Sequence, residues 1–215
     1  IIVEMFPVSA KVGALALLWA IIVGVPLGCL AAFKRGKLTD SILRVICTLG
    51  ISMPSFVVAS VLLVTLTGDG ALNLFPSIFD ACFALGFYPM CYTARQTRSA
   101  MLDSLSQEYI KTARAKGLKN KKIIFKHALR NALIPVITYL GPQVAFTLCG
   151  GFVVESVFSI PGLGRYFVQS IQNRDYPVIM GTTIFLATFI ILMNLVVDLL
   201  YKVADPRISL TKGGD

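Results

Sequence analysis

Residues Val12–Phe33 read VGALALLWAIIVGVPLGCLAAF, a run of 22 residues without a charged side chain. About 20 apolar residues form a helix long enough to cross the hydrocarbon core of a bilayer. The whole chain has the same character. Of its 215 residues, 56% are hydrophobic and only 14% are charged, whereas soluble domains carry roughly 25% charged residues. A soluble monomer would expose too much apolar surface, and a disordered chain would be rich in charge. The sequence therefore predicts an all-α integral membrane protein.

Four further stretches are long and apolar enough to be membrane spans, at residues 45–68, 71–94, 131–154 and 178–203. Pro54 lies inside the first of these, and a membrane helix can tolerate it. Residues 71–94 form the weakest candidate because Asp80 interrupts the run, but the part after Asp80 is too short to cross alone. We therefore expect five transmembrane helices in a single domain that covers residues 1–215.

The basic residues predict the orientation. Five spans in series place residues 34–44, 95–130 and 202–215 on one side, and these segments hold 17 of the 20 lysines and arginines. The other three are Lys11, Arg165 and Arg174. Since loops rich in Lys and Arg stay in the cytoplasm, we expect the C-terminus there and residues 155–177 outside. The net charge of +9 is thus explained by orientation, without a nucleic-acid partner.

The longest predicted cytoplasmic segment, residues 95–130, has the pattern of two helices joined at Gly117. In the second helix, Lys122, Lys126 and Arg130 recur on one face. Such a basic amphipathic segment suits either anionic lipid or a docked cytoplasmic protein, and composition does not separate the two.

No catalytic or metal-binding pattern is visible. The single histidine, His127, has no Cys, Asp or Glu at metal-ligand spacing, and no phosphate-binding loop occurs. The five cysteines lie in apolar stretches without a CxxC pair and are interpreted as buried small residues. We expect the chain to have no enzymatic activity, no metal and no cofactor of its own.

Five motifs carry a resemblance to a known family. They are YIKTARAKG at 109–117 followed by NALIP at 131–135, ESVFSIPGLG at 155–164, NRDYP at 173–177, DLLY at 198–201 and DPR at 205–207. The first resembles the EAA loop of ABC importer permeases, and the set is similar to the B-type (first) permease of the dipeptide, oligopeptide and nickel family. Lys111 and Thr112 stand where the general motif has its glutamate and first alanine. The family's usual first span has no counterpart before Ile1, so we expect an upstream segment to be missing from this sequence or its numbering.

The resemblance implies a type I ABC importer permease fold in the cell membrane, with the loop at 95–130 as a cytoplasmic helix-turn-helix coupling element. It implies four kinds of partner, namely a second (C-type) permease, two ABC ATPases that bind ATP and Mg, an external substrate-binding protein, and lipid. The expected contacts with the ATPase are Glu108, Thr112, Ala113, Arg114, Ala115, Gly117 and Leu118. The expected contacts with the binding protein are Phe158, Pro161, Gly162, Arg165 and Arg174.

Polar and aromatic residues inside the predicted spans are candidates for the substrate path, against the alternative that they only pack helices together. They are Ser55, Gln143, Phe146 and Thr147, with Met53 and Pro54 beside them. Asp80 is expected at headgroup level or along the path, and Asp198 is expected to pair with Lys202 one turn on.

The predicted function is that of a permease subunit for short peptides. A nickel importer of the same family is the main alternative. A channel or membrane scaffold is the remote one, although a channel or ion-coupled transporter would be expected to show charges at mid-membrane depth or inverted repeats.

Overall fold

The computed structural model describes residues 1–67, 77–119, 122–149 and 151–204. These residues form helices joined by short connections, and no strand occurs among them. The elements are α1 (Ile2–Phe33), α2 (Leu38–Ser52), α3 (Ser55–Thr67), α4 (Ser77–Ser106), α5 (Glu108–Ala115), the π-helix η1 (Ile123–Ala128), α7 (Leu129–Leu148), α8 (Phe152–Val157), α9 (Leu163–Asn173) and α10 (Tyr176–Ala204).

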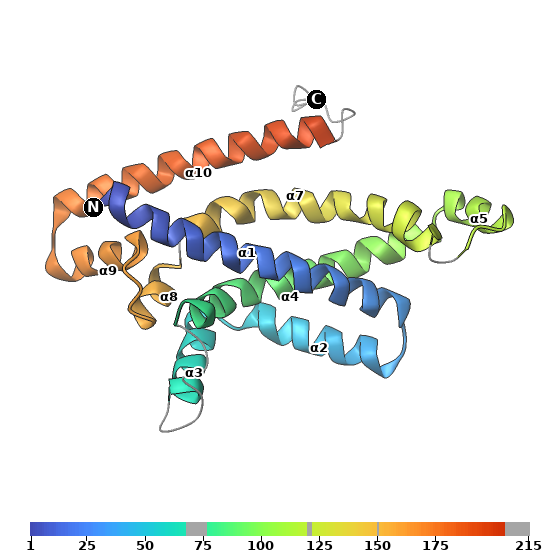
Figure 1. Cartoon of the computed structure of the whole chain (residues 1–215), viewed down its shortest axis with the longest axis horizontal. Helices are drawn as coiled ribbons and strands as arrows, with labels where there is room; N and C mark the ends of the chain where they lie inside the picture. Colours follow the sequence, from blue (N-terminus) through green and yellow to red (C-terminus); the bar gives the residue numbers. More distant parts are fainter. Residues whose placement is uncertain (68–76, 120–121, 150, 205–215) are drawn as a thin grey trace.

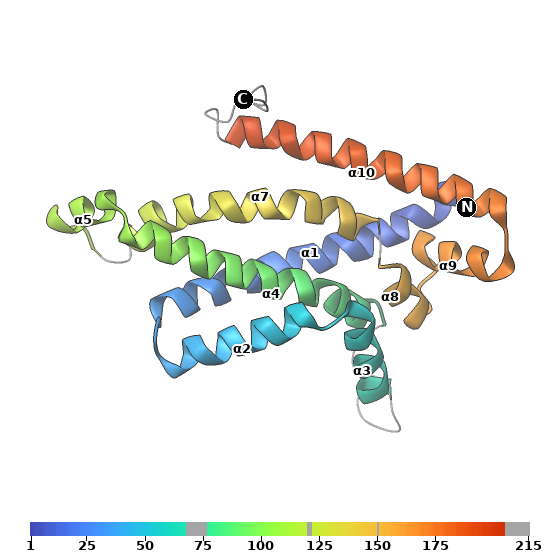
Figure 2. The same cartoon turned by 180° about the vertical axis from the view of Figure 1, so that it is seen from behind.

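The long helices α1, α4, α7 and α10 extend along one direction, with α5 at one end of the molecule and α8 and α9 at the other (Figures 1 and 2). Helix α1 packs against both α4 and α7, and α10 packs against α7 and α9. The segments predicted as coupling loop and external loop therefore lie at opposite ends of the bundle.

A stripe of small residues allows α1 to approach α4 closely. Ala16, Ala20, Gly24 and Gly28 recur every four residues and are buried. A Cβ atom at Gly28 would lie 2.5 Å from the Ala94 carbonyl oxygen, so only glycine fits there. Close backbone approach through small residues is how helices associate where hydrophobic burial gives little driving force, as it does in a membrane.

Among the described residues, three helical stretches are long and apolar enough to span a membrane, at Ile2–Phe33, Ile123–Val157 and Tyr176–Val197. The pair α2 and α3 would add a fourth, but its halves meet at an angle of 103°. The structure thus differs from the expectation of one helix through Pro54. Helix α4 is not among these stretches, so the span predicted at residues 71–94 stays a prediction.

Helix α4 runs to Ser106, so the predicted loop 95–130 begins as a continuation of a long helix. The buried face of α4 explains this, because Ala94, Thr97 and Met101 continue it without a helix breaker. Residues 71–76 of the predicted third span, the 205–207 motif and the side chains of Asp198 and Lys202 lie outside the described part of the chain.

Candidate functional site

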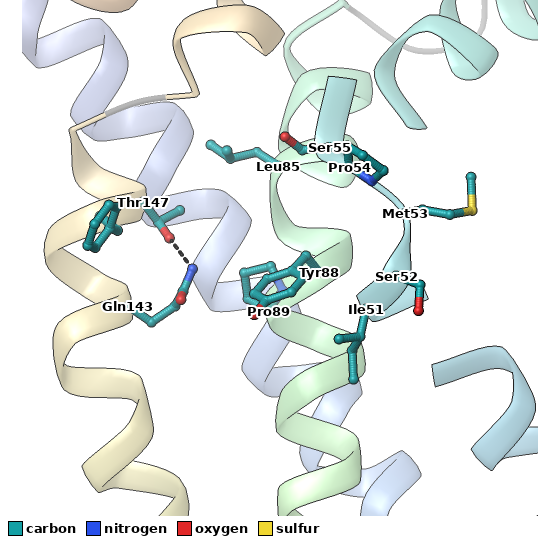
Figure 3. A pocket seen from close by; sticks show the side chains of 11 residues that line it. Ile51, Ser52, Met53, Pro54, Ser55, Leu85, Tyr88, Pro89, Gln143 and Thr147 are labelled. Atoms are coloured by element: carbon teal, nitrogen blue, oxygen red, sulfur yellow. Dashed lines mark hydrogen bonds between the residues drawn. The ribbon is translucent and has the colours of Figure 1, made fainter. Parts of the chain in front are cut away.

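A cleft of about 420 Å³ opens between the junction of α2 and α3, the middle of α4, and α7. Its eleven lining residues are Ile51, Ser52, Met53, Pro54, Ser55, Leu85, Tyr88, Pro89, Gln143, Phe146 and Thr147 (Figure 3). All four residues predicted from the sequence as path-lining candidates are in this set. The volume falls within the range of about 300–1,000 Å³ that small-molecule sites occupy.

One wall of the cleft is the elbow between α2 and α3, which we define as Met53 and Pro54. Met53 has an extended backbone, with φ −85° and ψ 125°, because the ring of a following proline disfavours the helical conformation. Helix α2 therefore ends at Ser52, and α3 starts at Ser55 in a new direction. The break places Ser52 and Ser55 at the cleft in place of the apolar surface of a continuous helix.

The opposite wall carries three polar side chains of α7 that we call the polar ladder, Tyr139, Gln143 and Thr147. They are spaced four residues apart and so share one face of the helix. The Tyr139 hydroxyl donates to Gln143 Oε1 at 3.3 Å, and Gln143 Nε2 donates to Thr147 Oγ1 at 3.2 Å. These side-chain bonds fix the position of the Gln143 amide along the cleft wall.

Aromatic rings connect α4 to the polar ladder. The rings of Tyr92 and Tyr139 stack with centroids 3.9 Å apart, and Tyr88, which lines the cleft, lies one turn from Tyr92 at 6.3 Å. The Arg95 guanidinium lies over the other end of this group, 5.9 Å from the centre of the Tyr92 ring. The stack ties α4 to α7 at a position one helical turn from the cleft.

None of the eleven lining residues is charged. The cleft can therefore form hydrogen bonds and apolar contacts with a guest molecule, but it offers no general acid, base or nucleophile pair. Within the described residues, no group of three or more His, Cys, Asp and Glu could hold a metal ion. His127 lies half-buried in η1, away from the cleft residues in sequence.

At the end of the bundle opposite α8 and α9, α5 is an amphipathic helix that is attached to the bundle by its apolar face. Ile110 and Ala113 are buried in a cluster with Met101 of α4, Ile123 of η1 and Ala128. The opposite face is exposed and carries Glu108, Thr112, Arg114 and Ala115. An eight-residue helix is not stable alone, so this apolar cluster holds it in place.

Helix α5 ends in a Schellman motif at Gly117, whose φ of +71° lies in the left-handed region. The Leu118 amide donates to the Ala113 carbonyl at 3.3 Å, and the Gly117 amide donates to the Arg114 carbonyl at 2.9 Å. The break at Gly117 predicted from the sequence is therefore present, with the hydrogen bonds that such a break requires.

Two residues predicted to contact an ATPase take part in the packing of the turn. Ala113 is 8% exposed and belongs to the apolar cluster, and Leu118 is half-buried and packs against that cluster. Their contact with an ATPase stays a prediction. Glu108, Thr112, Arg114, Ala115 and Gly117 remain on the accessible surface.

A buried ion pair between α2 and α4 was not foreseen. Arg98 donates to both carboxylate oxygens of Asp40, at 2.6 and 2.9 Å, and the Gly36 amide adds a bond of 3.1 Å. Asp40 is 1% exposed and lies before the predicted span 45–68. The pair fixes the first turn of α2 to α4.

Helices α8 and α9 are held together by a buried carboxylate. Glu155 is fully buried and accepts hydrogen bonds from the amides of Gly164 at 2.9 Å and Arg165 at 3.3 Å. Ser9 of α1 accepts from the Leu163 amide at 2.9 Å. Two side chains from other elements thus satisfy the free amides at the start of α9.

Among the residues predicted to meet a binding protein, Phe158 and Gly162 are buried. Phe158 is 7% exposed within an apolar cluster, and Gly162 lies against the Glu155 carboxylate. The contact of these two residues with a binding protein stays a prediction. Pro161 and Arg174 are exposed, and Arg165 is half-buried with its guanidinium donating to the Ser159 carbonyl at 2.8 Å.

Asp80 and the five cysteines, which the sequence also singles out, lie outside the cleft. Asp80 is half-buried in the first turn of α4, beside an apolar groove that also involves Trp19 and Phe83. All five cysteines are free, four of them are buried and Cys29 is half-buried, in agreement with their interpretation as small apolar residues.

Comparisons with known proteins agree with this geometry. Residues 24–210 match the family model described as "Binding-protein-dependent transport system inner membrane component". The dipeptide transport system permease protein DppB of Bacillus subtilis is 48% identical over 97% of this chain and 70% of its own length. The oligopeptide transport system permease protein OppB of Haemophilus influenzae is 40% identical over 97% of this chain and 71% of its length.

Solved structures agree at the level of the fold. The MetNI methionine ABC transporter, in inward-facing conformations, contains a chain that superposes with a TM-score of 0.70 over 95% of this chain and 96% of that chain, at 17% identity. A chain of an amino acid ABC transporter gives 0.67 over 93% and 90%, at 18% identity. The extent of the family match and the identity to its members show that this protein belongs to the family of inner membrane components of binding-protein-dependent transport systems.

Proposed function

We propose that this protein is the B-type permease of an ATP-driven importer of short peptides, and that the cleft is its share of the translocation path. As a member of its family, it is a multi-pass membrane permease and not an enzyme. The observation that carries the substrate assignment is the identity of 38–48% to permeases named for dipeptides and oligopeptides. The uncharged, hydrogen-bonding cleft supports it, since a peptide main chain needs hydrogen-bond partners and gains little from a charged wall.

The alternative of a nickel importer has less support. A bare divalent cation favours carboxylate, imidazole or thiolate ligands. The cleft lining has none of these groups, and the relatives described above are peptide permeases.

The proposed coupling element is α5 with the turn at Gly117. Its accessible residues Glu108, Thr112, Arg114 and Ala115 would contact a cytoplasmic ATPase, while its buried face transmits the movement to α4 and α7. This proposal rests on the amphipathic character of α5 and on its packing against α4 and η1, the latter continuing directly into α7. A rigid helix can transmit a rigid-body displacement.

The proposed topology has five passes, namely α1, the α2–α3 pair, α4, α7 and α10, with α5 and the C-terminus in the cytoplasm. The positions of α5 and α9 at opposite ends of the bundle support it (Figure 1). In this arrangement Pro161, Arg165 and Arg174 face the external binding protein.

The test is purification of this chain with its native partners, followed by reconstitution in liposomes. We expect a second permease and two ATPases to co-purify, and the complex to take up a labelled dipeptide when ATP and the loaded binding protein are supplied. Uptake of Ni²⁺ in preference to the dipeptide would favour the nickel alternative. A chain that purifies without any ATPase would overturn the proposal.

A further inference from the structure

The side-chain amide of Gln143 has hydrogen-bonding capacity that the polar ladder does not use. A glutamine amide has two N–H donors and two carbonyl lone pairs. The ladder uses one of each, because Oε1 accepts from Tyr139 and Nε2 donates to Thr147. If the amide oxygen and nitrogen of Gln143 exchange places, the hydroxyls of Tyr139 and Thr147 exchange their roles as donor and acceptor. The number of unused donors and acceptors on the amide stays the same. One N–H donor and one acceptor lone pair therefore stay free on a residue that lines the cleft.

The unused N–H donor and acceptor lone pair of Gln143 match the hydrogen-bonding groups of an extended peptide main chain. An extended residue presents its own N–H and C=O on the same side of the chain, which is why the two residues of a hydrogen-bonded pair in an antiparallel sheet exchange two bonds. A group with one donor and one acceptor can therefore bind one substrate residue through its main chain alone. Such recognition does not depend on the substrate side chain.

The ladder also holds the amide in a fixed place before substrate arrives. Thr147 is 3% exposed, and Tyr139 is stacked on Tyr92 at 3.9 Å, so both anchors are fixed by packing. A recognition group that is already oriented loses little conformational freedom on binding. The neighbouring Ile51, Leu85 and Phe146 offer apolar contact without a charged or directional requirement.

We propose that Gln143 binds the main-chain N–H and C=O of one residue of the transported peptide, and that Tyr139 and Thr147 are its positioning residues. The proposal rests on the peptide-permease function above and deepens it. The permease can then accept peptides with different side chains, because it binds the main chain that all of them share.

The test compares a tripeptide with its ester analogue, in which the central N–H is replaced by oxygen. Uptake of both is measured in proteoliposomes that hold the whole transporter, with the same binding protein saturated by each substrate. The variant Gln143→Met keeps a side chain of similar length without the amide. We expect it to lower the ratio of tripeptide to ester uptake by about tenfold, the factor that corresponds to one lost hydrogen bond at a buried site.

Two further variants sharpen the result. Tyr139→Phe keeps the ring stack on Tyr92 but removes the hydroxyl that orients the amide, so we expect a smaller fall in the same ratio. Gln172→Met makes the same chemical change at an exposed position of α9, outside the cleft, and should leave the ratio unchanged. If the Gln143→Met complex does not assemble, Tyr139→Phe supplies the same ratio measurement.

The outcomes separate the two proposals. A wild-type complex that takes up no peptide would refute the peptide function itself. A wild-type complex that transports peptide, with a ratio unchanged by both Gln143→Met and Tyr139→Phe, would refute the role of Gln143 and leave the function standing.

Discussion

Replacing Gly117 by valine perturbs the end of α5 without disturbing its neighbours. A Cβ atom at this position would have no heavy atom within 4 Å, so the added side chain meets open space. The whole cost comes from the backbone, whose φ of +71° lies in the left-handed region. For a residue other than glycine this conformation costs roughly 1–2 kcal/mol, and β-branched residues are the least suited to it.

A cost of about 1–2 kcal/mol corresponds to a factor of about 5–30 in an equilibrium constant. We therefore expect Gly117→Val to lower by about that factor the equilibrium constant between the helix end seen here and a frayed end, and to lower ATP-driven uptake. Asparagine visits the left-handed region readily, so Gly117→Asn should retain most of the uptake, and Gly117→Ala should fall between the two.

The assay is ATP hydrolysis and peptide uptake by the reconstituted complex, with thermal unfolding of the purified complex as the control for folding. We expect the ratio of uptake to hydrolysis to fall in the order Gly, Asn, Ala, Val, while the unfolding midpoint changes little. Equal coupling in the Asn and Val variants would refute the reasoning, because it would mean that the turn geometry does not matter.

Three other measurements check the remaining proposals. A cysteine at Lys119 should react with a membrane-impermeant thiol reagent only from the cytoplasm and one at Arg165 only from outside, and labelling of Lys119 from outside would invert the topology. Asp40→Asn should destabilise the complex by about 3 kcal/mol, the low end for a buried pair, because it leaves the part-buried Arg98 without its charged partner, whereas Asp40→Leu with Arg98→Met should restore most of the stability, as thermal unfolding will measure. Changing Arg165 and Arg174 together to glutamate should weaken stimulation of ATP hydrolysis by the binding protein, and unchanged stimulation and affinity would mean that α9 is only a lid.

The apolar runs were sufficient to predict the positions of α1, α7 and α10. The uncharged run at residues 12–33 lies within α1, and Gln143 and Thr147, which line the cleft, stood out because they interrupt an apolar stretch. A polar side chain in such a stretch must face protein or water, so its convergence on a cleft follows from the same physics. The helix break at Gly117 was predicted correctly for a local reason, since glycine is the common residue at that position of a helix end.

What the sequence did not reveal depends on distant contacts. Asp40 and Arg98 are 58 residues apart, and no local pattern links them. The inward position of Ala113 depends on Ile123 and Met101, which come from other helices. Phe158 is buried for the same reason. The sequence predicts a helix that tolerates Pro54. The angle of the bend between α2 and α3 depends on how α3 packs against α4 and α8.

The apolar cluster beneath α5 has a mechanical consequence for the cleft. Ala128 lies in that cluster at the end of η1, which continues into α7. The helical rise of about 1.5 Å per residue places Gln143 about 22 Å farther along α7. When α7 tilts by about 10° relative to α4 about this apolar cluster, Gln143 is displaced by about 4 Å, which is more than the length of a hydrogen bond. The Tyr92–Tyr139 stack lies between the apolar cluster and the cleft, so such a tilt would have to displace the two rings, whose centroids are 3.9 Å apart.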